Sequence, residues 1–134
     1  MAKKIIKSIK KRPINLILVI VVVCLYFINN TLIKPNTLGM VHIFFVSYFN
    51  DLMCPYFFLG YANMLLITCS REMATLKVIF IVGMTAGLTW EFIAPFLKKS
   101  SVTDPLDIVC YAISTVGYWA VLNAVINRKG KGNA

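Results

Sequence analysis

The chain has 134 residues, of which 59% are hydrophobic and 14% charged, with a mean hydropathy of +0.77. A water-soluble domain of this length could not cover so much apolar side chain with so few charges, so we expect a single domain that spans a membrane. The net charge of +9 does not indicate nucleic-acid binding, because the basic residues lie mainly at the ends of apolar segments, as in membrane proteins.

The first apolar segment covers residues 13–33 and follows a basic stretch at residues 1–12. At 1.5 Å per residue this segment spans about 31 Å, which matches a hydrocarbon core about 30 Å thick. Pro13 suits the first turn of a helix. Because no small-residue cleavage pattern follows the apolar run, we expect an uncleaved membrane helix and not a removed signal peptide.

The next apolar segment, residues 40–52, is too short to cross a membrane by itself. We interpret it as a half-helix or re-entrant segment on the outer side, and the alternative is that it fuses with the following segment into one long helix. Three further spanning helices are expected at residues 53–69, 75–97 and 105–126. The predicted fold is therefore an all-α integral membrane protein with four transmembrane helices plus the short segment.

Gly83 and Gly87 lie four residues apart in the third spanning segment, a spacing that lets the backbone of another helix approach closely. The cysteines show no metal-ligand or CxxC spacing, so we expect reduced apolar side chains, and we predict no metal and no cofactor. They are Cys24, Cys54, Cys69 and Cys110.

Four spans place both termini on one side of the membrane, and the distribution of basic residues indicates which side. Eleven basic residues lie on the side of the termini and three on the other. The positive-inside bias therefore places residues 1–12 and 127–134 in the cytoplasm. The three outer basic residues are Lys34, Lys98 and Lys99.

Four of the five acidic residues fall at the outer end in this topology, and only Glu72 lies on the inner side. An aspartate at lipid depth costs about 2.5–3.5 kcal/mol, so such groups are expected to face the bundle interior or a wet cavity. We predict a polar pocket that opens outward and is bounded by Asp51, Glu91, Asp107 and Tyr111.

The last spanning segment carries the polar pattern that supports this pocket. Asp107, Tyr111, Ser114 and Tyr118 are spaced i, i+4, i+7 and i+11, so they share one face of the helix. A polar face on an otherwise apolar membrane helix should be turned inward. The short segment before the second span adds His42 and Asn50 at the same outer end.

Several of these residues have simpler structural explanations. Asp104 is placed as the N-cap before Pro105, and Asp107 three positions on can accept from free backbone N–H groups. Asn50 and Asp51 could likewise cap the second span, His42 could simply be packed or hydrogen-bonded, and Ser114 could serve helix–helix hydrogen bonding.

Glu91 is the acidic residue that helix capping explains least. It lies late in its helix, where the helix dipole disfavours an anion, and no basic residue stands three or four positions away. Either it carries a proton because burial and nearby carboxylates disfavour its charge, or it pairs with a cation from another segment or a ligand.

These residues together resemble the VanZ-like superfamily of small membrane proteins. The resemblance rests on a glutamate late in one helix, a short loop of the form Ser-x-x-Asp, and a helix of the form Asp-x-x-x-Tyr-x-x-x-x-x-Gly; residues 50–55 (NDLMCP) are similar to a short subset of the family. The pattern is Glu91, Ser101, Asp104, Asp107, Tyr111 and Gly117.

The VanZ-like family is associated with teicoplanin resistance, so the resemblance implies a role in the bacterial cell envelope and a place in the cytoplasmic membrane. Besides the lipid bilayer, it implies a ligand among envelope lipids, wall precursors or antibiotics. Because no HExxH, GxSxG or Ser/His/Asp pattern is present, a non-enzymatic role is favoured. The alternatives are an enzyme acting on a lipid-linked substrate, a small transporter or proton pathway, and a structural partner subunit. A second copy of the chain is a further candidate partner, in a homo-oligomer.

Overall fold

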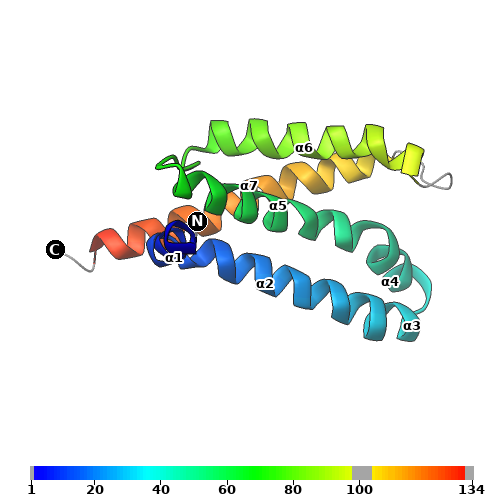
Figure 1. Cartoon of the computed structure of the whole chain (residues 1–134). Coiled ribbons are helices and arrows are strands. Elements are labelled where there is room, and N and C mark those ends of the chain that lie inside the picture. The colour runs from blue at the N-terminus through cyan, green and yellow to red at the C-terminus, as the bar shows by residue number, and fades with distance from the viewer. Residues whose placement is uncertain (1, 98–103, 132–134) are drawn as a thin grey trace.

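The computed structural model describes residues 2–97 and 104–131, and within them the chain is helical throughout its regular segments (Figure 1). Two short π-helical turns, η1 and η2, interrupt the α-helices. The elements are α1 Ala2–Lys11, α2 Pro13–Ile28, η1 Asn29–Ile33, α3 Lys34–Asn36, α4 Gly39–Ile43, η2 Phe44–Tyr48, α5 Phe49–Thr68, α6 Leu76–Leu97 and α7 Pro105–Lys131.

Four helices in the described residues are long and apolar enough to cross a membrane, which confirms the predicted all-α, multi-pass membrane fold. The bundle is apolar outside and partly polar inside: Phe57, Ile81 and Ile113 are exposed, whereas Asn15 and Asn63 are fully buried. A bilayer favours this arrangement, because it solvates apolar side chains and leaves polar groups to pair with one another. The spans are Pro13–Asn36, Gly39–Thr68, Leu76–Ile93 and Pro105–Asn127.

Residues 40–52 do not stand apart as a half-helix. They run through α4 and η2 into α5, so that Gly39–Thr68 is one helix of 30 residues, the fused arrangement considered as the alternative from sequence. Asn29, in η1, donates from Nδ2 to the carbonyl of Phe45 (3.0 Å) and to Asn50 Oδ1 (3.1 Å). These two hydrogen bonds connect the first span to the N-terminal part of the second span.

Helix α5 lies between α2 and α6, and α7 lies behind it and packs on both α5 and α6 (Figure 1). Helix α6 packs mainly on α7, through the two glycines that the sequence singled out. An added Cβ at Gly83 would lie 2.5 Å from Thr115 Oγ1, and one at Gly87 would lie 2.7 Å from the Tyr111 ring. The two glycines therefore form the surface against which α7 seats Thr115 and Tyr111.

A buried polar network joins three of the helices at the half of the bundle nearer the N-terminus. Tyr118 donates to Asn15 Oδ1 (2.9 Å), and Asn63 Nδ2 donates to the Tyr118 hydroxyl (3.1 Å). Asn63 also bonds the backbone of Met73 in the loop before α6, through both its amide nitrogen (3.1 Å) and its oxygen (2.9 Å). This amide and phenol network ties α2, α5 and α7 together without a net charge.

Helix α1 lies across one end of the bundle, where α7 also ends (Figure 1). Ser8 is buried and donates to the carbonyl of Met64 in α5 (2.7 Å). Lys11 and Arg12 pair with Glu72 at 2.9 and 2.5 Å, so both the middle and the end of α1 are attached. We call this end, which holds α1 and Glu72, the basic end, and the opposite end, which holds Asp51, Glu91, Asp104 and Asp107, the acidic end.

We expect the attachment of α1 to depend on pH. Burial opposes ionisation of Glu72, but the hydrogen bonds from Arg12 and Lys11 outweigh burial and hold the pKa of Glu72 below its ordinary value of 4.5. Because the folded-state pKa is the lower one, the contact stabilises the fold above pH 4.5 and is lost as pH falls through the folded pKa. The melting temperature of wild type should therefore exceed that of Glu72→Gln at neutral pH, and this difference should shrink progressively as the pH falls below 4.5. A difference in melting temperature that stays constant with pH would contradict this explanation.

Candidate functional site

Three side chains from three helices meet at the acidic end. The hydroxyl of Tyr111 in α7 lies 2.8 Å from Glu91 Oε1 in α6 and 3.2 Å from Asp51 Oδ1 in α5. Tyr111 is 1% exposed and Glu91 9% exposed, so their contact is shielded from the surroundings. We call these three residues the Tyr111 cluster. The structure thus brings together three of the four residues that the sequence placed around a pocket.

The Tyr111 cluster has more acceptors than protons. A tyrosine hydroxyl carries one proton, and an ionised carboxylate can only accept. One hydroxyl cannot donate fully to both Asp51 and Glu91, so the second contact requires either a proton on a carboxyl group or a cation beside it. Glu91 has no basic residue nearby in sequence. Its partner in the structure is the Tyr111 hydroxyl, which Glu91 shares with Asp51.

Pro55, one turn after Asp51, removes one backbone hydrogen bond from α5. It is buried inside α5, and proline has no N–H to donate to the carbonyl four residues earlier, which belongs to Asp51. The backbone carbonyl of Asp51 therefore lacks its usual helical donor. The site offers oxygen atoms suited to ligands that carry ammonium or hydroxyl donors.

The two aspartates at the start of α7 have different surroundings. Asp104 accepts from the backbone N–H of Leu106 (3.0 Å) and from the Tyr48 hydroxyl (3.2 Å), as a helix N-cap does. Asp107, one turn before Tyr111, is close enough to Glu91 and Asp51 for their charges to interact. Asp104 thus serves the helix start, whereas Asp107 adds negative charge beside the Tyr111 cluster.

The remaining residues singled out from sequence have partners of their own or none. Asn50 is held by Asn29, and His42 Nδ1 lies 3.3 Å from Thr37 Oγ1 in the connection between α3 and α4. Neither is hydrogen-bonded to the Tyr111 cluster. Ser114 is buried, and its hydroxyl has no partner among the described residues. Lys98, Lys99 and Ser101, which belong to the predicted outer loop and the family pattern, lie outside the described residues.

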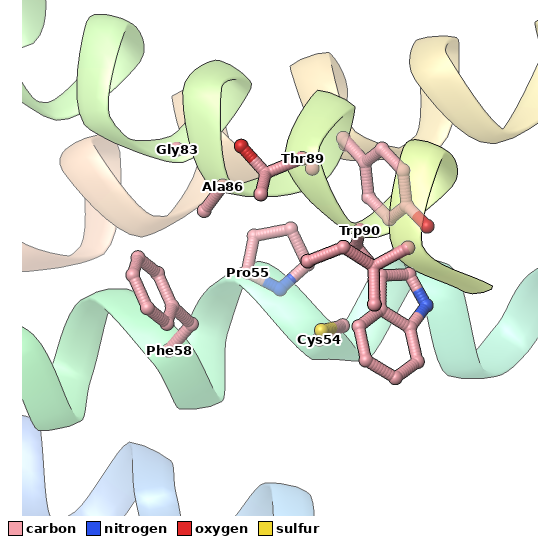
Figure 2. A pocket seen from close by; sticks show the side chains of 10 residues that line it. Cys54, Pro55, Phe58, Gly83, Ala86, Thr89 and Trp90 are labelled. Carbon is pink, nitrogen blue, oxygen red and sulfur yellow. The ribbon is translucent and has the colours of Figure 1, made fainter. Parts of the chain in front are cut away.

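An apolar groove of about 340 Å³ lies between α5 and α6 and reaches the Tyr111 ring. Figure 2 shows Cys54, Pro55 and Phe58 of α5 on one side of it, facing Ala86 and Trp90 of α6. We call it the α5–α6 groove. Its volume is within the range of small-molecule sites, and its composition suits an alkyl chain.

A second groove of about 480 Å³ lies between α2 and α5, and Trp90 of α6 also reaches it. It is bounded by apolar side chains such as Val22 and Phe57, and Asp51 and Asn50 stand at its polar edge. We call it the α2–α5 groove. Cys54 and Trp90 line both grooves, so the two grooves are neighbours.

The sequence reasoning missed Trp90, Cys54 and the grooves. A signal was present in α6, where the small residues Gly83, Ala86 and Gly87 are followed by Trp90 at helical spacing. The small residues of α6 face Pro55 of α5 across the α5–α6 groove, and no side chain fills the space between them. Such a pattern predicts a groove only when it is known that α5 and α6 are neighbours.

No family model, curated protein or solved structure matches this chain. The resemblance to VanZ-like proteins therefore stays a prediction. In the part of the chain that the structure describes, no group of three or more histidine, cysteine, aspartate or glutamate side chains is placed to hold a metal ion.

Replacing Tyr111 by phenylalanine should reveal how strongly the two acids depend on the hydroxyl. The ring would still fill its place against Gly87, but both carboxyl groups would lose their shared donor. We expect a loss of about 1–3 kcal/mol in the free energy of unfolding in detergent, and a smaller additional loss when Glu91→Gln is already present.

Tyr48→Phe is the matched control, because it removes one hydroxyl bond to an acid, that of Asp104, outside the cluster. It should lower the free energy of unfolding much less than Tyr111→Phe does, because the Tyr48 hydroxyl is exposed. Fully additive effects of Tyr111→Phe and Glu91→Gln would show that the two side chains are not coupled.

Proposed function

We propose that this protein is a VanZ-like protein of the bacterial cytoplasmic membrane, with both termini in the cytoplasm, that binds an amphiphilic component of the cell envelope at its acidic end. The ligand's head group is cationic or rich in hydroxyl groups. The observation that carries the proposal is the convergence of Asp51 and Glu91 on the single hydroxyl of Tyr111, beside two apolar grooves.

The head group follows from the hydrogen-bond balance of the site. Two carboxyl groups share the single proton donor of the Tyr111 hydroxyl, and Asp107 adds a further negative charge nearby. An ammonium group supplies both positive charge and N–H donors, and a sugar or polyol supplies O–H donors. A phosphate or sulfate head group would instead add acceptors where acceptors are already in excess.

The apolar part of the ligand follows from the position of the grooves. Both grooves open on the outside of the bundle, where lipid chains are the solvent, and both end near the Tyr111 cluster. A ligand that carries an alkyl chain can fill a groove while its head group reaches Asp51 or Glu91. Envelope lipids with ammonium or sugar head groups, the sugar part of lipid-linked wall precursors and amphiphilic glycopeptide antibiotics offer such donors, and their binding would connect the protein to envelope sensitivity.

Fluorescence of Trp90, which lines both grooves, offers a direct test. In a Trp119→Phe background, protein in nanodiscs is titrated with dodecylammonium, dodecyl maltoside and dodecyl sulfate. We expect the ammonium and maltoside probes to bind more tightly than the sulfate. Glu91→Gln should weaken the ammonium probe by about tenfold or more, since a charge-assisted hydrogen bond contributes about 1.5–3 kcal/mol.

Asp104→Asn is the control for that titration, because it removes the same charge from a helix cap at the same end of the bundle. It should leave the affinity for dodecylammonium within about twofold of the starting protein. Equal binding of the sulfate probe, or an unchanged affinity in Glu91→Gln, would overturn the proposed head-group preference.

A second candidate function is a proton or ion pathway, and one observation favours it. Along the inner face of α7, Tyr111, Ser114 and Tyr118 are buried in succession, and the hydroxyls of Ser114 and Thr115 have no partner in the described part of the chain. Buried polar groups between the Tyr111 cluster and the network of Tyr118 could hold water. Proton flux into proteoliposomes that is abolished by Glu91→Gln would support a pathway, and flux that survives this substitution would contradict a relay through Glu91.

A further inference from the structure

A hollow of about 410 Å³ lies at the basic end, between α1 and the end of α5, and its most prominent side chains are lysines. We call it the lysine hollow. It lies at the opposite end of the bundle from the Tyr111 cluster, and the proposed function makes no use of it. The residues that line it are Lys4, Lys7, Lys11, Ile67, Thr68 and Ser70.

The lysines are gathered by the helical period of α1. Lys4, Lys7 and Lys11 are spaced i, i+3 and i+7, so they share one face of the helix. That face is directed toward α5 because Ser8 donates to the carbonyl of Met64. Lys3 and Lys10 belong to the same helix and are exposed, but they do not line the hollow.

The end of α5 does not itself satisfy these lysines. Lysine side chains often donate to the free carbonyls of a helix C-terminus. Here backbone N–H groups already donate to the carbonyls of Leu66 and Ile67. Arg71 N–H donates to the Leu66 carbonyl and Ser70 N–H to the Ile67 carbonyl, both at 3.0 Å, and Ser70 has φ +61°. This is the Schellman ending of a helix, and it leaves the lysine ammonium groups facing the hollow.

The lysine hollow carries an excess of positive charge, which favours the binding of an anion. Of the five acidic side chains in the sequence, only Glu72 lies at this end, and it is already bonded to Lys11 and Arg12. Lys4 and Lys7 thus add like charges beside an ion pair that is complete. An anion placed among them would be attracted by all three lysines, and phosphate oxygens are acceptors suited to ammonium donors.

The depth of the hollow identifies the source of the anion. The span Gly39–Thr68 ends at Thr68 and the span Pro13–Asn36 begins at Pro13, so α1 and the hollow lie where the apolar helices end. In a bilayer this is the level of the lipid head groups, and a basic helix lying across it is the arrangement of an interfacial anchor. Ile67 gives the hollow an apolar side next to the lysines.

We propose that the lysine hollow is a binding site for the phosphate group of an anionic phospholipid. Lys4 and Lys7 bind the phosphate oxygens, Lys11 contributes charge while it stays paired with Glu72, and the lipid's glycerol and chains pass along Ile67. The bound lipid holds α1 against the end of α5 from the membrane side, as the Glu72 pairs hold it from the loop side.

The experiment compares two double variants with equal net charge, using the full chain in phosphatidylcholine nanodiscs with increasing phosphatidylglycerol. Lipid retained by the protein is counted by native mass spectrometry. Lys4→Gln with Lys7→Gln should weaken phosphatidylglycerol binding about tenfold more than Lys3→Gln with Lys10→Gln, because only the first pair lines the hollow. Lys4→Arg with Lys7→Arg should keep binding near that of wild type.

Three outcomes would overturn the proposal. Equal losses in the two glutamine pairs would show a diffuse basic surface without a site. Retention of phosphatidylcholine and phosphatidylglycerol to the same extent would show no preference for an anionic head group. Inorganic phosphate that binds in phosphatidylcholine nanodiscs with the same dependence on Lys4 and Lys7, and as tightly as the lipid, would assign the hollow to a soluble anion. Melting temperatures of all variants check that α1 stays folded.

Discussion

The bilayer's inability to solvate polar groups is the constraint on which this bundle depends, and α7 is where it acts most strongly. Tyr111 and Tyr118 lie on the same face of α7, both buried, and each hydroxyl joins side chains of two other helices. Because lipid offers these hydroxyls no hydrogen bonds, the helices that bring partners to them are held in a defined position. The packing of α2, α5 and α6 around α7 is thus organised by two tyrosines as well as by apolar contacts.

The two tyrosine clusters differ in the balance of hydrogen-bond donors and acceptors. Around Tyr118, amides donate and accept, and the network carries no charge. Around Tyr111, two carboxyl groups compete for one proton, at the end of the bundle where two grooves approach. A chain under selection for stability alone has no need of acids there, since a buried polar group that lacks a partner is costly. The unequal supply of donors is the observation that supports the ligand proposed for the acidic end.

Much of this arrangement could be predicted from sequence, because it follows from the spacing of residues along one helix and from their depth in the membrane. The inward face of α7, the N-cap at Asp104 and the shared depth of Asp51 and Glu91 all follow from spacing along single helices. The fusion of residues 40–52 with α5 could not be decided, since a short apolar run has the same pattern whether or not the helix continues. The grooves and the lysine hollow depend on which helices are neighbours, and a single helix does not contain that information.

The glycines of α6 connect the packing of the bundle to the chemistry of the Tyr111 cluster. Gly87 leaves room for the Tyr111 ring, which could not take its place beside even one added carbon. With the ring seated there, the Tyr111 hydroxyl reaches Glu91 one turn further along α6. Gly87 and the Tyr111 ring also line the α5–α6 groove, together with Trp90. A ligand chain in that groove would touch the ring whose hydroxyl holds both acids. Occupation of the groove would therefore act on the geometry of the two carboxyl groups through the side chain of Tyr111.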